Sequence, residues 1–347
     1  MILLKKWTFL LLVPAFLIAS CKSSTTTVEL QGNWVSWFSF NGNARSEAVC
    51  FTIDNKTYVG TGLNDASKRL KDFWEYNAAT GLWRKVKTLP EDAVARSGAV
   101  AFSVGGKGYV GTGYDDNGNR LKDFYEYTPG VNATDSGSWK PVADFVGTAR
   151  QGATAFAIGS KGYVISGDDG SYLKDFWEYN PAADSWTEKA FNGNKRREGV
   201  AFVVGEKAYF GTGINNGSIV YDFWEFDPKI SDLAKQWTRK RDISNVSEET
   251  FDDDYTTIAR SNAAAFVIGG KGFITTGENG GNVSDCWQYD PATDVWIKKT
   301  AFEGRSRTGA LGFSVNGKGF IMTGRSGSDP FDDLWEFYPD ATQVDND

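Results

Sequence analysis

The chain has 347 residues, with 37 basic and 44 acidic side chains, a formal net charge of −7 and no histidine. The acidic balance argues against nucleic acid as a partner, because nucleic-acid-binding proteins present basic patches. Without histidine, and with only three widely spaced cysteines, a zinc site is not expected.

The first twenty residues are typical of an export signal. Lys5 and Lys6 precede an apolar run over residues 7–18, which suits the core of a signal peptide but is short for a membrane span. Residues 17–21, Leu-Ile-Ala-Ser-Cys, resemble the lipobox of bacterial lipoproteins, in which the cysteine is acylated and becomes the new N-terminus. The resemblance implies a signal peptide over residues 1–20 and a lipid anchor at Cys21, followed by a flexible polar tether over residues 21–32. The alternative is an ordinary secretory signal that is cleaved nearby.

This beginning predicts where the protein resides. Without residues 1–20 the chain keeps 35 basic and 44 acidic residues, a net charge of −9. Lys22 follows Cys21, where an inner-membrane sorting signal would have aspartate, so we expect an outer-membrane lipoprotein that contacts the bilayer through acylated Cys21. The face of the membrane on which it lies is open.

One sequence pattern recurs six times after this segment. Each copy opens with an arginine, followed six residues later by phenylalanine and seven residues after that by tyrosine or phenylalanine. The arginines are Arg45, Arg96, Arg150, Arg196, Arg260 and Arg307. A two-residue turn such as Gly105-Gly106 lies between the aromatic positions, a type that closes tight hairpins. Each copy therefore begins with a β-hairpin, whose strands are called a and b.

Two further strands complete each copy. Strand b ends in Gly-Thr-Gly or a close variant, and a loop of variable sequence follows. Strand c then reads Lys-Asp-Phe-Trp-Glu-Tyr or similar, with an aspartate in all six copies: Asp72, Asp123, Asp175, Asp222, Asp285 and Asp333. A lone tryptophan further on marks strand d. The pattern predicts four antiparallel strands for each copy.

The N-terminus is expected to close the circle of copies. The sixth copy has no tryptophan after Trp335, whereas Trp34 precedes Arg45 by the same interval that separates Trp296 from Arg307. We therefore predict an all-β, six-bladed β-propeller of four-stranded blades over residues 33–339, closed by an N-terminal strand and followed by a disordered tail over residues 340–347. Closure of this kind leaves no blade edge unpaired.

The repeated glycines of strand b, the aromatic residue of strand c and the later tryptophan resemble the motif of the kelch family, with Gly-Thr-Gly in place of Gly-Gly. The resemblance covers the whole predicted propeller. Kelch propellers include binding proteins, a copper oxidase and sugar mutarotases, so the fold does not settle the function. Because the copper oxidase binds its metal through histidine and tyrosine, the lack of histidine argues against galactose-oxidase chemistry. We expect no metal and no cofactor.

The six arginines begin the innermost strands and should form a ring at one mouth of the central channel. Two roles are open for them. In the first role, they pair with the carboxylates of strand c and lock each blade, because a buried charge needs a partner. In the second role, they bind a ligand that carries a carboxylate or sulfate. Gln288 replaces the strand-c glutamate in the fifth copy, so under the first role Arg260 or a neighbour would have spare binding capacity.

We expect simpler roles for the other lysines, cysteines and acidic residues that the sequence pattern singles out. The lysines that follow the hairpin turns, such as Lys56 and Lys161, are expected to be solvated, and Cys50 and Cys286 to be buried without a disulfide. The long acidic segment over residues 241–259 either binds a divalent cation or is simply solvated.

The sequence favours a membrane-anchored binding module without catalysis, monomeric, for a protein or glycan partner at the cell envelope. The alternative is a sugar-active enzyme resembling sialic-acid (N-acetylneuraminate) mutarotases, which would use channel arginines and carboxylates for acid and base catalysis. The enzyme would need a Glu or Asp at the channel mouth that lies outside the repeat, and the sequence does not identify one.

Overall fold

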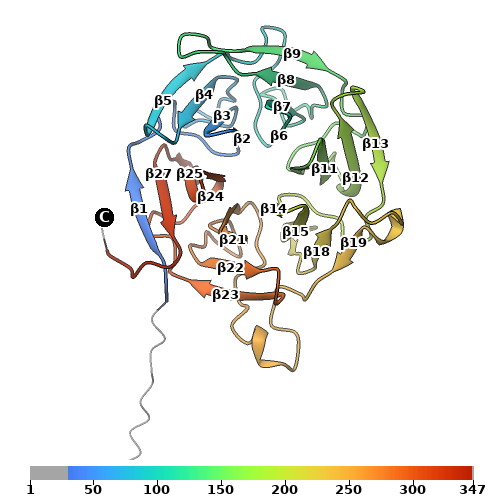
Figure 1. Ribbon diagram of the computed structural model, residues 1–347, viewed down its shortest axis with the longest axis vertical. Helices are drawn as coiled ribbons and strands as arrows, with labels where there is room; N and C mark the ends of the chain where they lie inside the picture. Colours follow the sequence, from blue (N-terminus) through green and yellow to red (C-terminus); the bar gives the residue numbers. More distant parts are fainter. Residues whose placement is uncertain (1–29, 346–347) are drawn as a thin grey trace, which may run out of the picture.

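The computed structural model describes residues 30–345 and shows six blades arranged around a central channel (Figure 1). Each blade contains a four-stranded antiparallel sheet whose first strand lines the channel, which confirms the predicted six-bladed β-propeller. The predicted signal peptide, the lipidation site at Cys21 and residues 21–29 of the tether lie outside the described residues. No helix in the described part is long and apolar enough to cross a membrane.

The first three blades follow one another in chain order. Blade 1 consists of β2 (Val49–Ile53), β3 (Lys56–Gly60), β4 (Phe73–Asn77) and β5 (Leu82–Val86). Blade 2 consists of β6 (Val100–Val104), β7 (Lys107–Gly111), β8 (Phe124–Thr128) and β9 (Ser138–Val142). Blade 3 consists of β10 (Thr154–Ile158), β11 (Lys161–Asp168), β12 (Tyr172–Asn180) and β13 (Ser185–Lys189).

The other three blades carry small additions. Blade 4 consists of β14 (Val200–Val204), β15 (Lys207–Gly211), β18 (Phe223–Phe226) and β19 (Trp237–Arg239), with a short hairpin of β16 (Ile214–Asn215) and β17 (Ser218–Ile219). Blade 5 consists of β20 (Ala264–Ile268), β21 (Lys271–Thr275), β22 (Cys286–Asp290) and β23 (Val295–Lys299). Blade 6 consists of β24 (Thr308–Val315), β25 (Lys318–Ser326), β27 (Leu334–Tyr338) and β1 (Asn33–Trp37), with β26 (Asp329–Pro330) beside β25. Two 3-10 turns, η1 (Leu233–Lys235) and η2 (Thr250–Asp252), lie in connecting segments.

The circle closes through β1, as the sequence predicts. β1 pairs with β27 from Asn33 opposite Tyr338 to Trp37 opposite Leu334. Hydrogen bonds extend beyond this strand pair on both sides: the Gly32 amide donates to the Ala341 carbonyl, and the Val344 amide donates to the Asn33 side chain. Gly32 is predicted to lie in the tether, and Ala341 and Val344 in a disordered tail. These residues are hydrogen-bonded to one another or to β1.

Neighbouring blades pack through aromatic rings. In blade 1 the rings of Phe51 and Tyr58 stack at 5.2 Å, and both contact Tyr127 of blade 2. The ring of Phe51 lies so close to Gly108 of blade 2 that a Cβ there would be 2.1 Å from it. A larger residue at this position would push the blades apart, so the small residue belongs to the blade interface.

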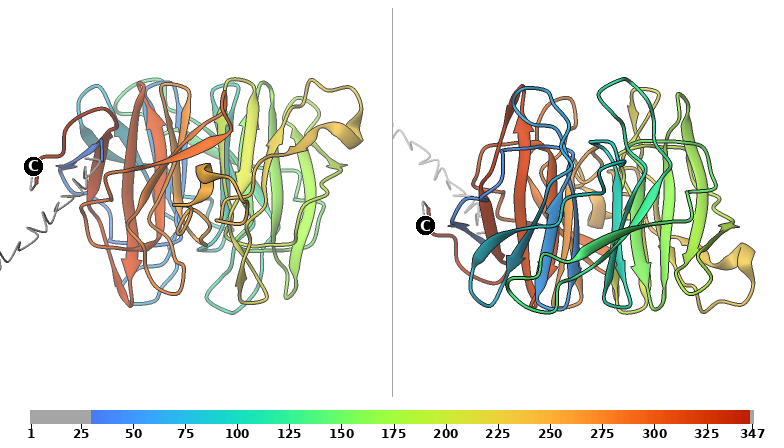
Figure 2. Two further views of the ribbon diagram at one scale, coloured as in Figure 1. Left: turned by 90° about the horizontal axis from the view of Figure 1, so that it is seen from below. Right: turned by 90° about the horizontal axis from the view of Figure 1, so that it is seen from above.

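A circle of backbone hydrogen bonds joins all six blades at one end of the channel. It is formed by the residue two positions after each repeated arginine: Glu47, Gly98, Gly152, Glu198, Asn262 and Gly309. Each of these residues donates its amide to the carbonyl of the preceding one, at 2.7 to 3.0 Å, and the amide of Glu47 completes the circle by donating to Gly309. We call this end the channel mouth. The side views in Figure 2 show that the strands run between this end and the opposite end, which carries the hairpin turns.

Candidate functional site

The six repeated arginines surround the channel near the mouth, but none is accessible from it. Every one of these side chains is fully buried. In each blade the arginine Nη1 donates to the carbonyl of the middle residue of the Gly-Thr-Gly segment, which for Arg45 is Thr61 at 3.0 Å. The arginine thereby ties the start of strand a to the end of strand b.

In five blades the same arginine also binds the aspartate of strand c. Arg45 contacts the two carboxylate oxygens of Asp72 at 2.8 and 2.9 Å, and Arg96 contacts those of Asp123 at 2.7 Å each. The pairs Arg150 with Asp175 and Arg307 with Asp333 repeat the two-oxygen contact, whereas Arg196 binds one carboxylate oxygen of Asp222 and Asn194 donates to the other. We call this arrangement the arginine clamp. It corresponds to the first of the two predicted roles, because a ligand in the channel cannot reach these guanidinium groups unless a blade opens.

Blade 5 departs from the arginine clamp. Arg260 donates to the backbone carbonyl of Asp285, while the Asp285 carboxylate binds Thr257 at 2.7 Å and Lys298 at 2.9 Å. The Arg260 Nη2 is buried and has no hydrogen-bond partner within the described residues. Burial lowers the pKa of Arg260 to about 10. Arg260 thus keeps one unused donor because the Asp285 carboxylate turns away, but its side chain is fully buried, and the spare binding capacity for a ligand stays a prediction.

The strand-c glutamates have a separate set of partners. Glu75 is buried and accepts hydrogen bonds from Tyr58 and Arg84, and Lys56 forms an ion pair with it at 3.1 Å. Lysines at the corresponding positions of blades 2, 4 and 6 pair with their own strand-c glutamates. These lysines are partly exposed at the hairpin turns, as predicted, but in these blades each also forms an ion pair with a carboxylate of its blade that the prediction did not include.

The remaining candidates have structural surroundings. Cys50 and Cys286 are both free thiols. In the acidic segment 241–259, Asp252 is buried and accepts hydrogen bonds from the amides of Val246 and Ser247. Among the described residues no group of three or more Cys, Asp or Glu side chains has a geometry that could hold a metal ion.

The arginine clamp leads to a stability prediction. Replacing Asp72 by alanine leaves the Arg45 guanidinium buried without its counter-ion, and we expect the free energy of unfolding to fall by about 3 kcal/mol. Asp285 is the matched control, because its carboxylate is about as exposed (23% against 21%) but does not contact the arginine of its blade. Asp285→Ala should cost about 1 kcal/mol. Urea denaturation of both variants measures the difference, and equal losses would contradict the assigned role of the clamp.

The channel mouth contains two side chains that break the repeat. All six residues of the backbone circle have left-handed φ angles between 53° and 65°. Glycine fills this position in three blades and asparagine in one, which are the residues that adopt such angles at little cost. Glu47 and Glu198 occupy it in the other two blades and bear the backbone strain. Strain that a fold retains is concentrated at functional sites.

The two glutamates line one cavity. It has a volume of about 120 Å³ and is bordered by Glu47, Glu198, Gln151 and Asn262 together with glycines and alanines of the innermost strands. Glu47 belongs to blade 1 and Glu198 to blade 4, so they approach the mouth from opposite sides of the six-bladed circle (Figure 1). Below the cavity the channel wall consists mainly of alanine, valine and glycine. The polar chemistry of the channel is therefore confined to the mouth.

An arginine that is not part of the clamp lies beside each glutamate. Arg197 Nε is 3.3 Å from Glu198 Oε1, and Arg325 Nη2 is 3.1 Å from Glu47 Oε1. Arg197 also approaches Asp168 Oδ2 at 3.6 Å. Both arginines remain about one third exposed, at 32% and 35%. Neither arginine lines the cavity itself, but both are partly open to solvent beside a glutamate that does, unlike the six buried arginines.

Glu198 lines the mouth cavity, and its surroundings shift the pKa of its carboxyl group. Burial raises the pKa of the Glu198 carboxyl above its ordinary value. Arg197 opposes this shift, whereas the negative charges of Glu47, Glu278 and Asp168 add to it. A carboxyl group with a raised pKa keeps its proton to a higher pH than an ordinary glutamate, which suits a general acid.

This shift predicts a pH-dependent difference in stability. The folded protein binds the Glu198 proton more tightly than the unfolded chain does, so this carboxyl favours folding below its unfolded pKa and loses that contribution as pH rises through the folded pKa. Glutamine mimics the protonated group and does not ionise. The free energy of unfolding of Glu198→Gln, relative to wild type, should therefore be larger at about pH 8 than at about pH 4. Urea denaturation at both pH values measures it, and a pH-independent difference would show that the carboxyl is not perturbed.

Sequence reasoning missed Glu47 and Glu198, although a signal was present. When the six copies are aligned on their arginines, the second residue after each arginine reads Glu, Gly, Gly, Glu, Asn and Gly. Two charged residues at a position otherwise filled by small or amide residues stand out in this alignment. Their location in the mouth and their proximity to Arg325 and Arg197 required the structure.

Comparisons with known proteins bear on the fold and the site. Residues 24–196 match the kelch-repeats domain described for KLHDC2, KLHL20 and DRC7. The N-acetylneuraminate epimerase of Pasteurella multocida (strain Pm70) is 32% identical over 136 residues, which are 37% of this chain and 33% of the epimerase. The match thus spans about a third of that relative. The solved structure of YjhT is similar with a TM-score of 0.68 and 14% identity, over 85% of this chain and 95% of YjhT, and this likeness shows the fold alone.

Proposed function

The chain belongs to the kelch-repeat β-propeller family, and we propose that its channel mouth binds an acidic sugar and interconverts the anomers of that sugar by proton transfer through Glu198. The observation that carries the proposal is the Glu198 carboxyl, which lies outside the repeat, lines the mouth cavity and has a raised pKa. The partial match to an N-acetylneuraminate epimerase supports an acidic sugar as the substrate class.

The chemistry requires only proton transfers. A cyclic sugar changes its anomer when the anomeric hydroxyl gives its proton to a base, the bond between the anomeric carbon and the ring oxygen breaks, and the ring oxygen gains a proton. The open carbonyl form then closes on its other face and both protons return. A carboxyl group with a raised pKa can serve as the acid, and a second carboxylate across the cavity as the base. Glu198 and Glu47 are assigned these two roles.

Substrate binding is assigned to the exposed arginines of the mouth. Arg197 and Arg325 are ion-paired with the two glutamates, so a carboxylate on the sugar would meet a preformed positive group beside each one. The buried clamp arginines hold the backbone of the mouth in place and do not touch the substrate. This assignment replaces the predicted ring of Arg45, Arg96, Arg150, Arg196, Arg260 and Arg307 by two arginines that the repeat does not contain.

Non-catalytic binding is the second candidate function. The ion pairs at the mouth favour it, because glutamates already paired with arginines suit recognition and require no proton transfer. In this case the propeller would present the mouth to a glycan or protein at the cell envelope. Attachment to the outer membrane through acylated Cys21 is part of both candidate functions and rests on the N-terminal sequence.

The anomer-exchange experiment tests the proposal and separates the two candidates. The propeller, residues 30–345, is added to N-acetylneuraminate, and the exchange between anomers is followed by NMR while binding is followed by tryptophan fluorescence. We expect saturable binding and faster exchange, with Glu198→Gln lowering the rate by about 10²-fold to 10⁴-fold and changing the affinity little. Lys161→Ala, at the far end of blade 3, should leave both quantities unchanged.

The other outcomes are equally clear. Binding at the mouth without faster exchange would contradict the enzyme and support the binding module. Faster exchange that persists in Glu198→Gln would remove Glu198 from the reaction. Absence of both binding and exchange would exclude this acidic sugar as a ligand.

A further inference from the structure

A long groove crosses the hairpin end of blades 1 and 2, at the opposite end of the propeller from the channel mouth. Two adjoining cavities of about 610 and 340 Å³ form it and share Lys56, Asn77, Gly130 and Val131. One wall is the turn between β4 and β5, and the other is the segment that connects β8 with β9. We propose that this blade 1–2 groove binds an extended segment of a partner protein. An acidic side chain of the segment would lie against Lys56, and apolar side chains would lie against two exposed residues at the rim, Leu82 and Val131, which we call the lips.

The groove exists because one connecting segment is long. Trp139 lies twelve positions after Tyr127 in blade 2, whereas the corresponding Trp83 lies seven positions after Tyr76 in blade 1. The extra residues extend over the hairpin end of the blade and form the second wall. The corresponding interval is seven positions in blades 3 and 5 and eleven in blade 4, so the long wall is not part of the repeat.

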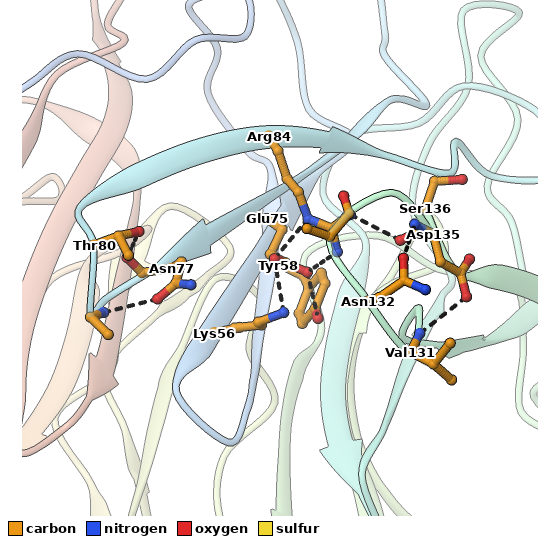
Figure 3. A network of polar contacts seen from close by, with 12 residues as sticks. Lys56, Tyr58, Glu75, Asn77, Thr80, Arg84, Val131, Asn132, Asp135 and Ser136 are labelled. Atoms are coloured by element: carbon orange, nitrogen blue, oxygen red, sulfur yellow. Dashed lines mark hydrogen bonds and ion pairs between the residues drawn. The ribbon is translucent and has the colours of Figure 1, made fainter.

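Arg84 holds this wall in position. Its Nη1 donates to the carbonyls of Ala133 and Asp135 at 3.0 and 2.9 Å, while its Nε and Nη2 bind Glu75 (Figure 3). Asp135 accepts hydrogen bonds from the amides of Val131 and Gly137, which fixes the curve of the segment. The wall is therefore formed before a ligand arrives, and binding does not have to order it.

The smaller cavity of the groove, of about 340 Å³, carries excess positive charge. Lys56 and Arg84 share one carboxylate, Glu75, which is buried and uses both oxygen atoms for its protein partners. Although burial opposes it, hydrogen bonds from Arg84, Lys56 and Tyr58 keep the pKa of Glu75 below its ordinary value. In the smaller cavity two cations thus face one anion, while the larger cavity adds the exposed carboxylate of Asp54 at the turn between β2 and β3. The Lys56 side chain is 36% exposed and its ammonium can donate further hydrogen bonds, which favours an acidic ligand group.

The neighbouring amides add hydrogen-bond donors. The Asn77 side-chain oxygen accepts from the Ala79 amide, and the Asn132 side-chain oxygen accepts from the Thr134 amide. The side-chain oxygens are therefore used inside the protein, and the NH₂ groups remain for a ligand. Figure 3 shows Lys56 between Asn77 on one wall and Asn132 on the other. Donors spaced along a groove suit the backbone carbonyls of an extended peptide.

The exposed apolar residues favour a peptide over a sugar. The lips are Leu82, which is 68% exposed, and Val131, which is 91% exposed. Aliphatic side chains contact other apolar side chains, whereas sugar rings stack on the open face of an aromatic ring. Of the rings that line the groove, Tyr58 is buried and Trp83 packs against Phe40 and Tyr76. The groove thus offers apolar contact on its lips and a charged centre.

Peptide selection on the propeller, residues 30–345, tests this proposal. A phage-displayed library of random peptides is selected on the wild-type protein and counter-selected on Val131→Asp, which places a negative charge on an exposed lip. We expect the enriched peptides to share an aspartate or glutamate beside aliphatic residues. Their affinity should fall about tenfold in Lys56→Ala and in Val131→Asp.

Two controls separate this groove from folding defects and from the channel mouth. Lys161→Ala removes the corresponding lysine of blade 3, where the connecting segment is short, and should not change the affinity. Glu198→Gln should not change it either, so the proposal is independent of the sugar site. Enriched peptides that bind Lys56→Ala and Val131→Asp as well as wild type, failure to enrich any peptide, or a glycan that these substitutions displace would each overturn it.

Discussion

The buried pairing of one arginine with one aspartate is the contact on which the shape of the mouth depends. The clamp joins the start of strand a, the end of strand b and strand c of one blade through a fully buried guanidinium group. Because a buried charge without its partner is costly, this contact admits few alternative geometries. The two residues that follow each arginine are therefore held at a defined place beside the channel, and the backbone circle between blades can close.

This rigid frame explains how the mouth acquires a distinct chemistry without disturbing the fold. The circle uses only backbone amides and carbonyls, so its side chains are free to vary from blade to blade. Left-handed backbone angles make both Glu47 and Glu198 unfavourable at this place, and burial of the charge adds to the cost at Glu198. A fold that tolerates glycine at the same position in three other blades does not need either charge for its own stability. Residues that lower the stability of the fold at this place are expected if the mouth acts on a ligand.

The fold could be predicted almost completely from sequence, because six copies of one pattern fix the strands and the position of Trp34 fixes the closure. The aspartates were also identifiable as arginine partners, but the geometry of single contacts was not. Asp285 turns to Lys298 and Thr257, and Thr257 comes from a long insertion that has no counterpart in the other blades. The glutamates of strand c recruit hairpin lysines because both are brought to the same blade edge, which only the folded register shows. The raised pKa of Glu198 likewise depends on burial and on charges from several blades, which come together only in the folded protein.

The two ends of the propeller are built by different means. At the mouth, side chains vary on a backbone that the clamp and the circle keep constant, so new chemistry arises by substitution. At the hairpin end the turns between strands c and d are free to lengthen, and the segment after β8 does so, with Arg84 holding the added residues against blade 1. Ligands at the two ends should therefore bind independently, because groups that are far apart and share no partner contribute additively to the free energy.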